Sequence, residues 1–216
     1  MISLSGLNPQ QRLAAETIEG PVLILAGAGS GKTRTLTYRI AHMVDNLEIP
    51  PSQILGVSFT NKAAKEMRER VHSLLGRRKS KGITLSTFHS LGVRILKSEI
   101  TKLGYHRNFS IYDTTDQMSI IREGLKLYKA DKNFDKKVVL SKIGFLKNRG
   151  ISAIEFSKTR HFNEEDPYDI ATETVYHFYE DKLKFYNAID FDDILFLVVR
   201  LFKEHPEVAR TWSEKY

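Results

Sequence analysis

The stretch that decides the fold is Val22-Leu23-Ile24-Leu25-Ala26-Gly27-Ala28-Gly29-Ser30-Gly31-Lys32-Thr33. Its apolar start is typical of a buried strand, and it runs into a loop of small residues that ends in Gly31-Lys32-Thr33. Apolar residues then recur at helical spacing, at Leu36, Ile40, Val44 and Leu47. A strand, a glycine-rich loop, Lys-Thr and a helix in this order predict a phosphate-binding loop.

The residue types of this loop suit a nucleoside triphosphate. Small residues let backbone N–H groups close around phosphate oxygens, and the start of the following helix adds partial positive charge. We expect Lys32 to contact the β- and γ-phosphates and the Thr33 hydroxyl to complete a Mg²⁺ shell. The usual pattern has glycine where this chain has Ala26, although three glycines still follow in the loop. The alternative is a glycine-rich turn that binds nothing.

Composition restricts the possible classes of protein. The 216 residues carry a formal net charge of +7 and include no cysteine, which excludes a disulfide framework and a thiolate metal site. Residues 62–107 hold 12 Lys/Arg and 3 Asp/Glu, whereas residues 155–196 hold 4 Lys/Arg and 11 Asp/Glu. This asymmetry favours a surface that binds a polyanion. We see neither a signal peptide nor an apolar stretch of bilayer length, and we expect a cytoplasmic protein without a membrane segment.

The first hundred residues repeat a strand–loop–helix pattern three times. The strands are expected at residues 22–25, 54–59 and 83–88, which predicts a parallel sheet covered by helices. Because ligands of such sheets bind at the carboxyl ends of the strands, the three following loops should share one functional edge. Residues 109–188 are predicted to be almost entirely helical, with a capping box at Thr114-Thr115-Asp116-Gln117. A further helix is expected beyond Asp190.

Polar and aromatic side chains follow the second and third expected strands. Ser58-Phe59-Thr60-Asn61 and Ser86-Thr87-Phe88-His89 combine an aromatic ring, which can stack on a base, with groups that bind phosphate. The alternative is that Phe59 is a core residue, Asn61 an N-cap and His89 a structural histidine. The recurrence of this pattern beside the basic segment favours single-stranded nucleic acid.

Two further segments carry weaker signals. Gln11 lies shortly before the first strand, and its amide can both donate to and accept from adenine, although Asn8-Pro9 also begins an ordinary helix. Asp190-Phe191-Asp192-Asp193 suggests a metal site, but these carboxylates precede an apolar run instead of following one. We therefore interpret Asp192 and Asp193 as residues that stabilise a helix start, not as metal ligands.

Taken in order, these segments resemble the UvrD/Rep/PcrA helicases of superfamily 1. Leu7-Asn8 with Gln11 is similar to their Q motif, residues 26–34 to motif I, and residues 59–64 to motif Ia. Thr87-Phe88-His89 is similar to the next single-strand-binding motif, and Asp190-Phe191-Asp192-Asp193 to the segment before motif II. Ala26 agrees with the family, whose motif I usually begins A-G-A-G-S-G-K-T. The resemblance covers essentially the whole chain.

The resemblance implies an ATP-dependent helicase that uses Mg²⁺, moves 3′→5′ on single-stranded DNA and unwinds duplex DNA in repair or replication. Its partners would be single-stranded DNA and junctions of single- and double-stranded DNA. The implied ATP-binding residues, with Gln11 reading adenine, Arg34 stacking on it and Lys32 and Thr33 as the catalytic pair, are Gln11, Ala26, Gly27, Ala28, Gly29, Ser30, Gly31, Lys32, Thr33 and Arg34. The implied Mg²⁺ ligand is Thr33, and the implied DNA contacts are Phe59, Thr60, Asn61, Arg70, Thr87, Phe88 and His89.

The resemblance also implies a division of the chain. Residues 1–108 would form a RecA-like subdomain 1A, an α/β P-loop domain whose parallel sheet is flanked by helices. Residues 109–189 would form an all-helical insertion, subdomain 1B, and residues 190–216 would return to 1A before motif II. Hydrolysis needs a positioned water and neutralisation of charge on the γ-phosphate. Without motif II and the second domain's arginine fingers, we expect this N-terminal fragment to be catalytically inactive.

Two other classes of protein remain as alternatives. One is a P-loop enzyme of another kind, such as a small kinase, which should not bind single-stranded DNA, whereas a helicase fragment should bind it with strong salt dependence. The other is a helical scaffold with a vestigial loop, in which Lys32→Ala would leave nucleotide binding unchanged.

Overall fold

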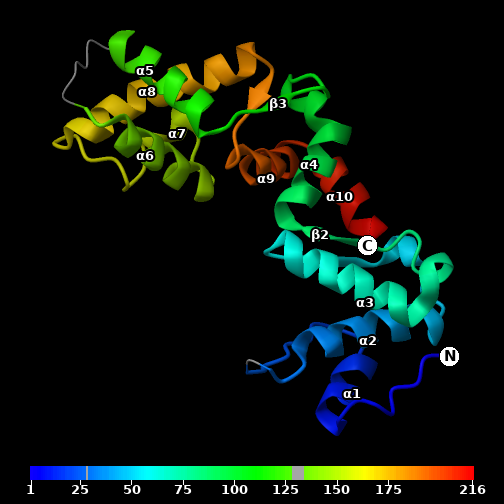
Figure 1. Cartoon of the computed structure of the whole chain (residues 1–216). Helices are drawn as coiled ribbons and strands as arrows, with labels where there is room; N and C mark the ends of the chain where they lie inside the picture. The colour runs from blue at the N-terminus through cyan, green and yellow to red at the C-terminus, as the bar shows by residue number, and fades with distance from the viewer. Residues whose placement is uncertain (28, 128–133) are drawn as a thin grey trace. The chain divides into compact units, whose positions relative to one another are not determined.

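The computed structural model describes residues 1–27, 29–127 and 134–216. Contacts divide them into two compact units: the first unit is Met1–Ser90 with Thr211–Tyr216, and the second unit is Leu91–Arg210 (Figure 1). The protein is α/β, mostly helical with small parallel sheets. Within the described ranges, no helix is both long enough and apolar enough to cross a bilayer.

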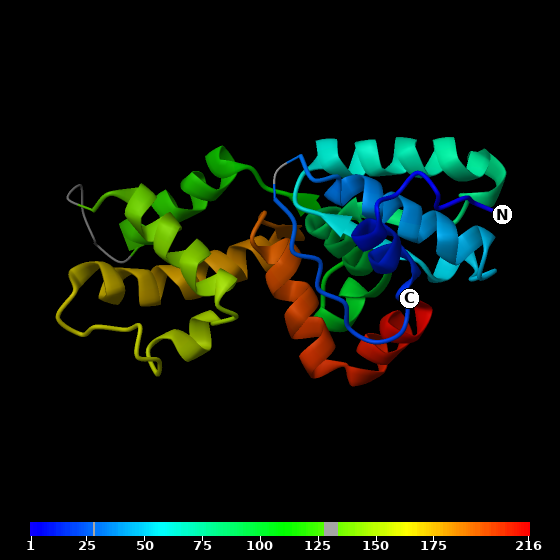
Figure 2. The same ribbon diagram turned by 90° about the horizontal axis from the view of Figure 1, so that it is seen from below.

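The sheet of the first unit is a parallel pair of short strands. β1 (Leu55–Ser58) and β2 (Thr84–Thr87) pair with Leu55 opposite Thr84 and Ser58 opposite Thr87. Parallel strands need a crossover, which here is α3 (Asn61–Lys79), and α3 packs against α2 (Lys32–Asp45) (Figure 2). The strands expected at residues 54–59 and 83–88 are therefore confirmed.

The core of the first unit lies between these helices and strands. Its buried side chains, which include the helical-period positions of α2 and α3, are Ile40, Ala41, Ile54, Met67, Val71, Leu75 and Leu85. Gly56 leaves room for side chains of β2 and α3, because a Cβ there would lie 2.6 Å from Leu85 Cδ2 and 3.2 Å from Met67 Sδ. Leu36 and Val44 pack against this core, whereas Leu47 lies beyond α2 and is exposed.

The strand expected at residues 22–25 is absent from the structure. These residues have no regular secondary structure, and their exposed fractions alternate, at 39% for Val22, 82% for Leu23, 38% for Ile24 and 86% for Leu25. The alternation is that of an extended segment, but a strand requires a hydrogen-bonded neighbour. Among the described residues of the first unit, only β1 and β2 pair, so the apolar run is left outside the sheet.

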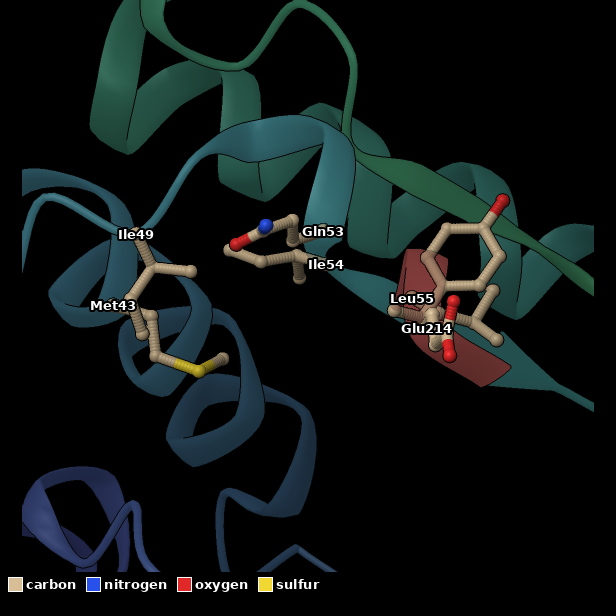
Figure 3. A pocket seen from close by; sticks show the side chains of 7 residues that line it. Met43, Ile49, Gln53, Ile54, Leu55 and Glu214 are labelled. Carbon is tan, nitrogen blue, oxygen red and sulfur yellow. The ribbon is translucent and has the colours of Figure 1, made fainter. Parts of the chain in front are cut away.

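An open hollow lies beside β1 in the first unit. It measures about 590 Å³, and Figure 3 shows Met43, Ile49 and Ile54 around it, with Glu214 from α10 (Pro206–Lys215) on the other side. The chain end reaches β2, where the Tyr216 hydroxyl lies 3.2 Å from Thr84 Oγ1. The remaining elements of this unit are α1 (Pro9–Glu16), which packs on α2, and the 3-10 turn η1 (Pro51–Gln53).

The second unit is built mainly from helices. α4 (Phe88–Glu99) leads into it, followed by the 3-10 turn η2 (Ile100–Leu103). Helices α5 (Thr114–Leu127), α6 (Lys136–Asn148), α7 (Ala153–Phe156) and α8 (Pro167–Phe185) surround a core that includes Ile121, Ile143, Tyr176 and Tyr179. α9 (Asp193–Glu204) is the helix expected beyond Asp190.

Two local features of the second unit differ from the sequence prediction or were not predicted. β3 (Ser110–Ile111) and β4 (Ala188–Ile189) form a second parallel pair, which was not predicted. The capping box of α5 lies one residue earlier than expected. Asp113 Oδ1 accepts N–H bonds from Thr115 and Asp116 at 2.7 and 3.0 Å, and the Asp116 carboxylate accepts the Asp113 N–H. A carboxylate is a stronger acceptor than the Thr114 hydroxyl, which explains the shift.

Candidate nucleotide and nucleic-acid sites

The start of α2 presents unsatisfied backbone donors. Gly31 is the N-cap with φ 86°, a left-handed conformation that glycine adopts without strain, and Gly29 has φ 76°. The first backbone bond of the helix joins Thr35 N–H to Gly31 O at 2.9 Å. The N–H groups of residues 32–34 therefore have no acceptor within α2, and together with the helix dipole they form a place for an anion.

Lys32 lies folded over the loop that precedes it. Its Nζ donates to Ala26 O at 2.9 Å and to Gly27 O at 2.7 Å. The Ser30 hydroxyl also donates to Gly27 O, at 2.7 Å. Carbonyl oxygens thus occupy the positions around the ammonium group that phosphate oxygens would take. Ala28 lies outside the described residues.

Gln11 and Arg34 lie beside the loop, and both donate to backbone carbonyls. Gln11 Nε2 donates to Ser30 O at 2.9 Å, and Gln11 Oε1 accepts the Asn8 N–H at 3.2 Å. Arg34 Nη2 donates to Gly6 O at 2.9 Å, and its guanidinium carbon lies 5.7 Å from the centre of the Tyr38 ring. The structure therefore brings Gln11 to the loop, whereas the Arg34 guanidinium is bonded to the segment before α1.

A hollow of about 290 Å³ joins α1 to the loop, near the lower end of the range of about 300–1,000 Å³ for ligand pockets. Gln11, Ser30 and Lys32 line it together with Ala26 and Gly27. Thr33 and Arg34 are exposed on the first turn of α2. None of the described residues that line this hollow carries a carboxylate.

The residue that follows β1 is an exposed aromatic. Phe59 is 93% exposed, so the alternative that it belongs to the core is excluded. The N-cap of α3 is Thr60, whose Oγ1 accepts the Ala63 N–H at 3.1 Å, and Asn61 is the first helical residue. The predicted cap therefore lies one residue away from Asn61. Arg70 is exposed on α3.

The residues that follow β2 meet this aromatic. The Phe88 ring lies 5.8 Å from the Phe59 ring between centroids and is 43% exposed. His89 is half-buried on the first turn of α4. Thr87 is buried and turned inward, with its hydroxyl donating to Ser90 Oγ at 2.9 Å. Two of the three expected strand ends thus share one aromatic surface, whereas the strand expected at residues 22–25 does not join the sheet.

The acidic segment before α9 belongs to a buried ionic cluster, to which we give the name α6–α9 cluster: Lys147, Tyr179, Asp190 and Asp193. Lys147 Nζ contacts Asp190 Oδ2 and Asp193 Oδ1, each at 2.6 Å, and the Tyr179 hydroxyl donates to Asp190 at 2.8 Å. Asp192 instead accepts a bond from Asn148 Nδ2. Lys147 was not predicted from the sequence. Its spacing of four residues from Ile143 places both residues on the buried face of α6, and this spacing was a signal that the lysine has charged partners.

A glycine-rich loop, a lysine at the start of a helix and parallel strands joined by a crossover helix are features of P-loop proteins. A family model described as the UvrD/REP helicase N-terminal domain matches residues 7–216, and the chain belongs to this family.

Curated relatives agree with this assignment. The chain is 45% identical over 214 residues to the ATP-dependent DNA helicase PcrA of Bacillus subtilis, a match that covers 99% of this chain and 28% of the relative. It is 41% identical to PcrA of Staphylococcus aureus strain Mu50 and 40% identical to PcrA of Staphylococcus epidermidis, each covering 99% of this chain and 29% of the relative. The chain thus spans less than a third of the length of these relatives.

Proposed function

We propose that this chain is the ATP-binding part of an ATP-dependent DNA helicase that moves 3′→5′ on single-stranded DNA and unwinds duplex DNA. Family membership and the names of the PcrA relatives support the proposal. The observation that carries it is the loop itself, where the Lys32 ammonium group and the start of α2 converge on the same few residues. We further propose the division into a RecA-like subdomain 1A at 1–108 and 190–216 and a helical subdomain 1B at 109–189.

The chemistry of the loop fits a triphosphate with Mg²⁺. Lys32 already binds two oxygens, and phosphate oxygens would replace the carbonyls of Ala26 and Gly27. A Cβ at Gly27 or Gly29 would meet nothing within 4 Å, so free space lies beside both glycines. The N–H groups of residues 32–34 would bind the phosphates, and the Thr33 hydroxyl would serve as the protein ligand of Mg²⁺. The metal would neutralise charge on the phosphates.

Recognition of adenine requires two side chains to exchange partners. Gln11 would release Ser30 and Asn8 to donate to and accept from the base edge. Arg34 would release the Gly6 carbonyl to stack on the adenine ring. Each exchange replaces one hydrogen bond or stacking contact by another, so neither opposes binding strongly.

The nucleotide-binding proposal is tested by calorimetric titration of residues 1–216 with Mg-ATP. We expect the wild-type chain to bind and Lys32→Ala to lose at least about tenfold in affinity, because a charge-assisted bond contributes about 1.5–3 kcal/mol. Lys158→Ala is the matched control, because Lys158 is an exposed lysine that follows α7. Equal affinities of the wild-type chain and Lys32→Ala would contradict the proposal and favour a vestigial loop.

We propose that the Phe59–Phe88 surface contacts single-stranded DNA, together with Thr60, Asn61, Arg70 and His89, whereas the predicted contact Thr87 is buried and bonds Ser90. Support comes from the exposure of Phe59 and from the exposed cation Lys62 in the first turn of α3. Aromatic rings that stack on bases and cations that follow the backbone are the usual elements of single-strand binding. A small kinase should not bind single-stranded DNA and would not require such a surface.

The DNA proposal is tested by fluorescence anisotropy with a labelled oligothymidylate. We expect Phe59→Ala to weaken binding by about 1–3 kcal/mol, the typical contribution of one base stacked on an aromatic ring. Phe185→Ala removes an equally conspicuous exposed ring, 80% exposed at the end of α8, and should leave the affinity unchanged. Binding should also fall steeply with salt. A Phe185→Ala loss as large as that of Phe59→Ala would place the surface elsewhere.

A further inference from the structure

The amide of Gln11 is bonded at both ends. Its oxygen faces a backbone donor, the Asn8 N–H at 3.2 Å, and its nitrogen faces a backbone acceptor, the Ser30 carbonyl at 2.9 Å. These two partners allow only one orientation of the amide, because a swapped orientation would place donor against donor. The Asn8 bond belongs to the capping box that begins α1, so the side chain is anchored to a helix.

The bond to Ser30 orients the peptide group that leads into α2. The described backbone contains no cis peptide bond, so the Ser30 carbonyl and the Gly31 N–H point in opposite directions across one planar unit. When Gln11 holds the carbonyl toward α1, the Gly31 N–H is directed away from α1. Gly31 directly precedes Lys32, whose ammonium group covers the loop. Gln11 therefore sets the direction of one backbone donor of the loop.

Gln11 also packs against the residue that precedes α2. A Cβ added to Gly31 would lie only 2.7 Å from Gln11 Nε2, so the side chain rests directly against the backbone of residue 31. Gly31 is the N-cap of α2 and has φ 86°. The amide thus contacts the loop through a hydrogen bond and through close packing at the same point.

We propose that Gln11 is a positioning residue of the phosphate loop, acting on the Ser30–Gly31 peptide even when no base is present. This inference rests on the proposed function, since it assumes that residues 26–33 bind a phosphate chain. It goes beyond recognition of adenine, because the hydrogen bonds to Asn8 and Ser30 already use the amide atoms of Gln11 that a base would use. A phosphate chain without a base should therefore depend on Gln11 as well.

The test compares a ligand without a base with ATP. Mg-tripolyphosphate and Mg-ATP are titrated calorimetrically into residues 1–216 carrying Gln11→Ala or Gln11→Met, and the second variant keeps the length of the side chain against Gly31. We expect both variants to bind Mg-tripolyphosphate roughly fivefold more weakly, the effect of one lost hydrogen bond. Glu16→Gln, an exposed change on the same helix, should leave both affinities unchanged.

A second measurement separates positioning from a general loss of structure. In the ligand-free chain, the amide chemical shift of Gly31 should change in both Gln11 variants, whereas the midpoint of thermal unfolding should fall by only a few degrees, the effect of the lost bonds to Asn8 and Ser30. Variants that bind Mg-tripolyphosphate as the wild type does and lose only Mg-ATP would overturn the inference and leave Gln11 as a reader of the base. A wild type that binds ATP but not tripolyphosphate would overturn it too. A wild type that binds neither ligand would contradict the proposed function itself.

Discussion

Lys147 shows how one residue can determine the chemistry of its surroundings. Its side chain is fully buried in the α6–α9 cluster with two carboxylates, which leaves a net negative charge away from water. Burial by itself lowers the pKa of Lys147, but the charges of Asp193 and Asp190 outweigh it and raise that pKa. Burial raises the pKa of Asp193 to about 6, because Lys147 compensates only part of the charge.

The raised pKa of Asp193 predicts an unusual dependence of stability on pH. Between about pH 4 and pH 6 the folded chain keeps a proton on Asp193 that the unfolded chain has released, so this group stabilises the fold at low pH. Its contribution should be lost as the pH rises through about 6, by up to about 3 kcal/mol.

The measurement is urea unfolding of the wild type and Asp193→Asn at several pH values between 4.5 and 7.5. Other carboxylates titrate in both proteins, so the difference in free energy of unfolding isolates Asp193. We expect the wild type to lose stability relative to Asp193→Asn as the pH rises. A difference that stays constant, or that grows in favour of the wild type with rising pH, would show that Asp193 is ionised throughout.

Helix boundaries illustrate what the sequence determines at the scale of an element. The period of α2 was predicted because apolar residues three and four apart must share one buried face. The caps were less predictable, because adjacent side chains compete for the same N–H groups. Asp113 is preferred over Thr114 at the start of α5, and Thr60 over Asn61 at the start of α3.

The position of the α5 cap can be tested by single substitutions. Asp113→Ala removes an acceptor of two backbone N–H groups and should lower the free energy of unfolding by about 0.5–2 kcal/mol. Thr114→Ala should change it by only a few tenths of a kcal/mol, because alanine suits the first turn of a helix. Chemical denaturation of both variants provides the measurement. A larger loss for Thr114→Ala would restore the capping box that the sequence suggested.

Residues 22–25 show where prediction from the sequence ended. Their apolar character predicted a buried strand, which was wrong, because strand formation depends on a hydrogen-bonded neighbour that local sequence does not specify. The ion pairs of Lys147 could not be predicted from local sequence either, since Asp190 lies 43 residues away along the chain. Lys32 could be recognised as a site residue because its motif is contiguous. The bond between Gln11 and Ser30 could not, because only the packing of α1 on α2 creates it.

At the scale of the whole molecule, charge divides between the two units. Most of the basic segment 62–107 precedes Ser90 and lies in the first unit, and the acidic segment 155–196 lies entirely in the second unit. The first unit also holds the phosphate loop and the Phe59–Phe88 surface. The sites proposed for ATP and for DNA therefore belong to one compact unit.

The central claim is that residues 26–33 bind the phosphates of ATP. The most direct measurement is a titration of the ¹⁵N-labelled chain with Mg-ATP, followed by the backbone amide resonances. We predict that the largest changes in chemical shift occur at Gly29, Gly31, Lys32 and Thr33, with little change across residues 91–210. Saturable binding whose largest changes lie outside the loop, or no change in the loop at saturating Mg-ATP, would contradict the account.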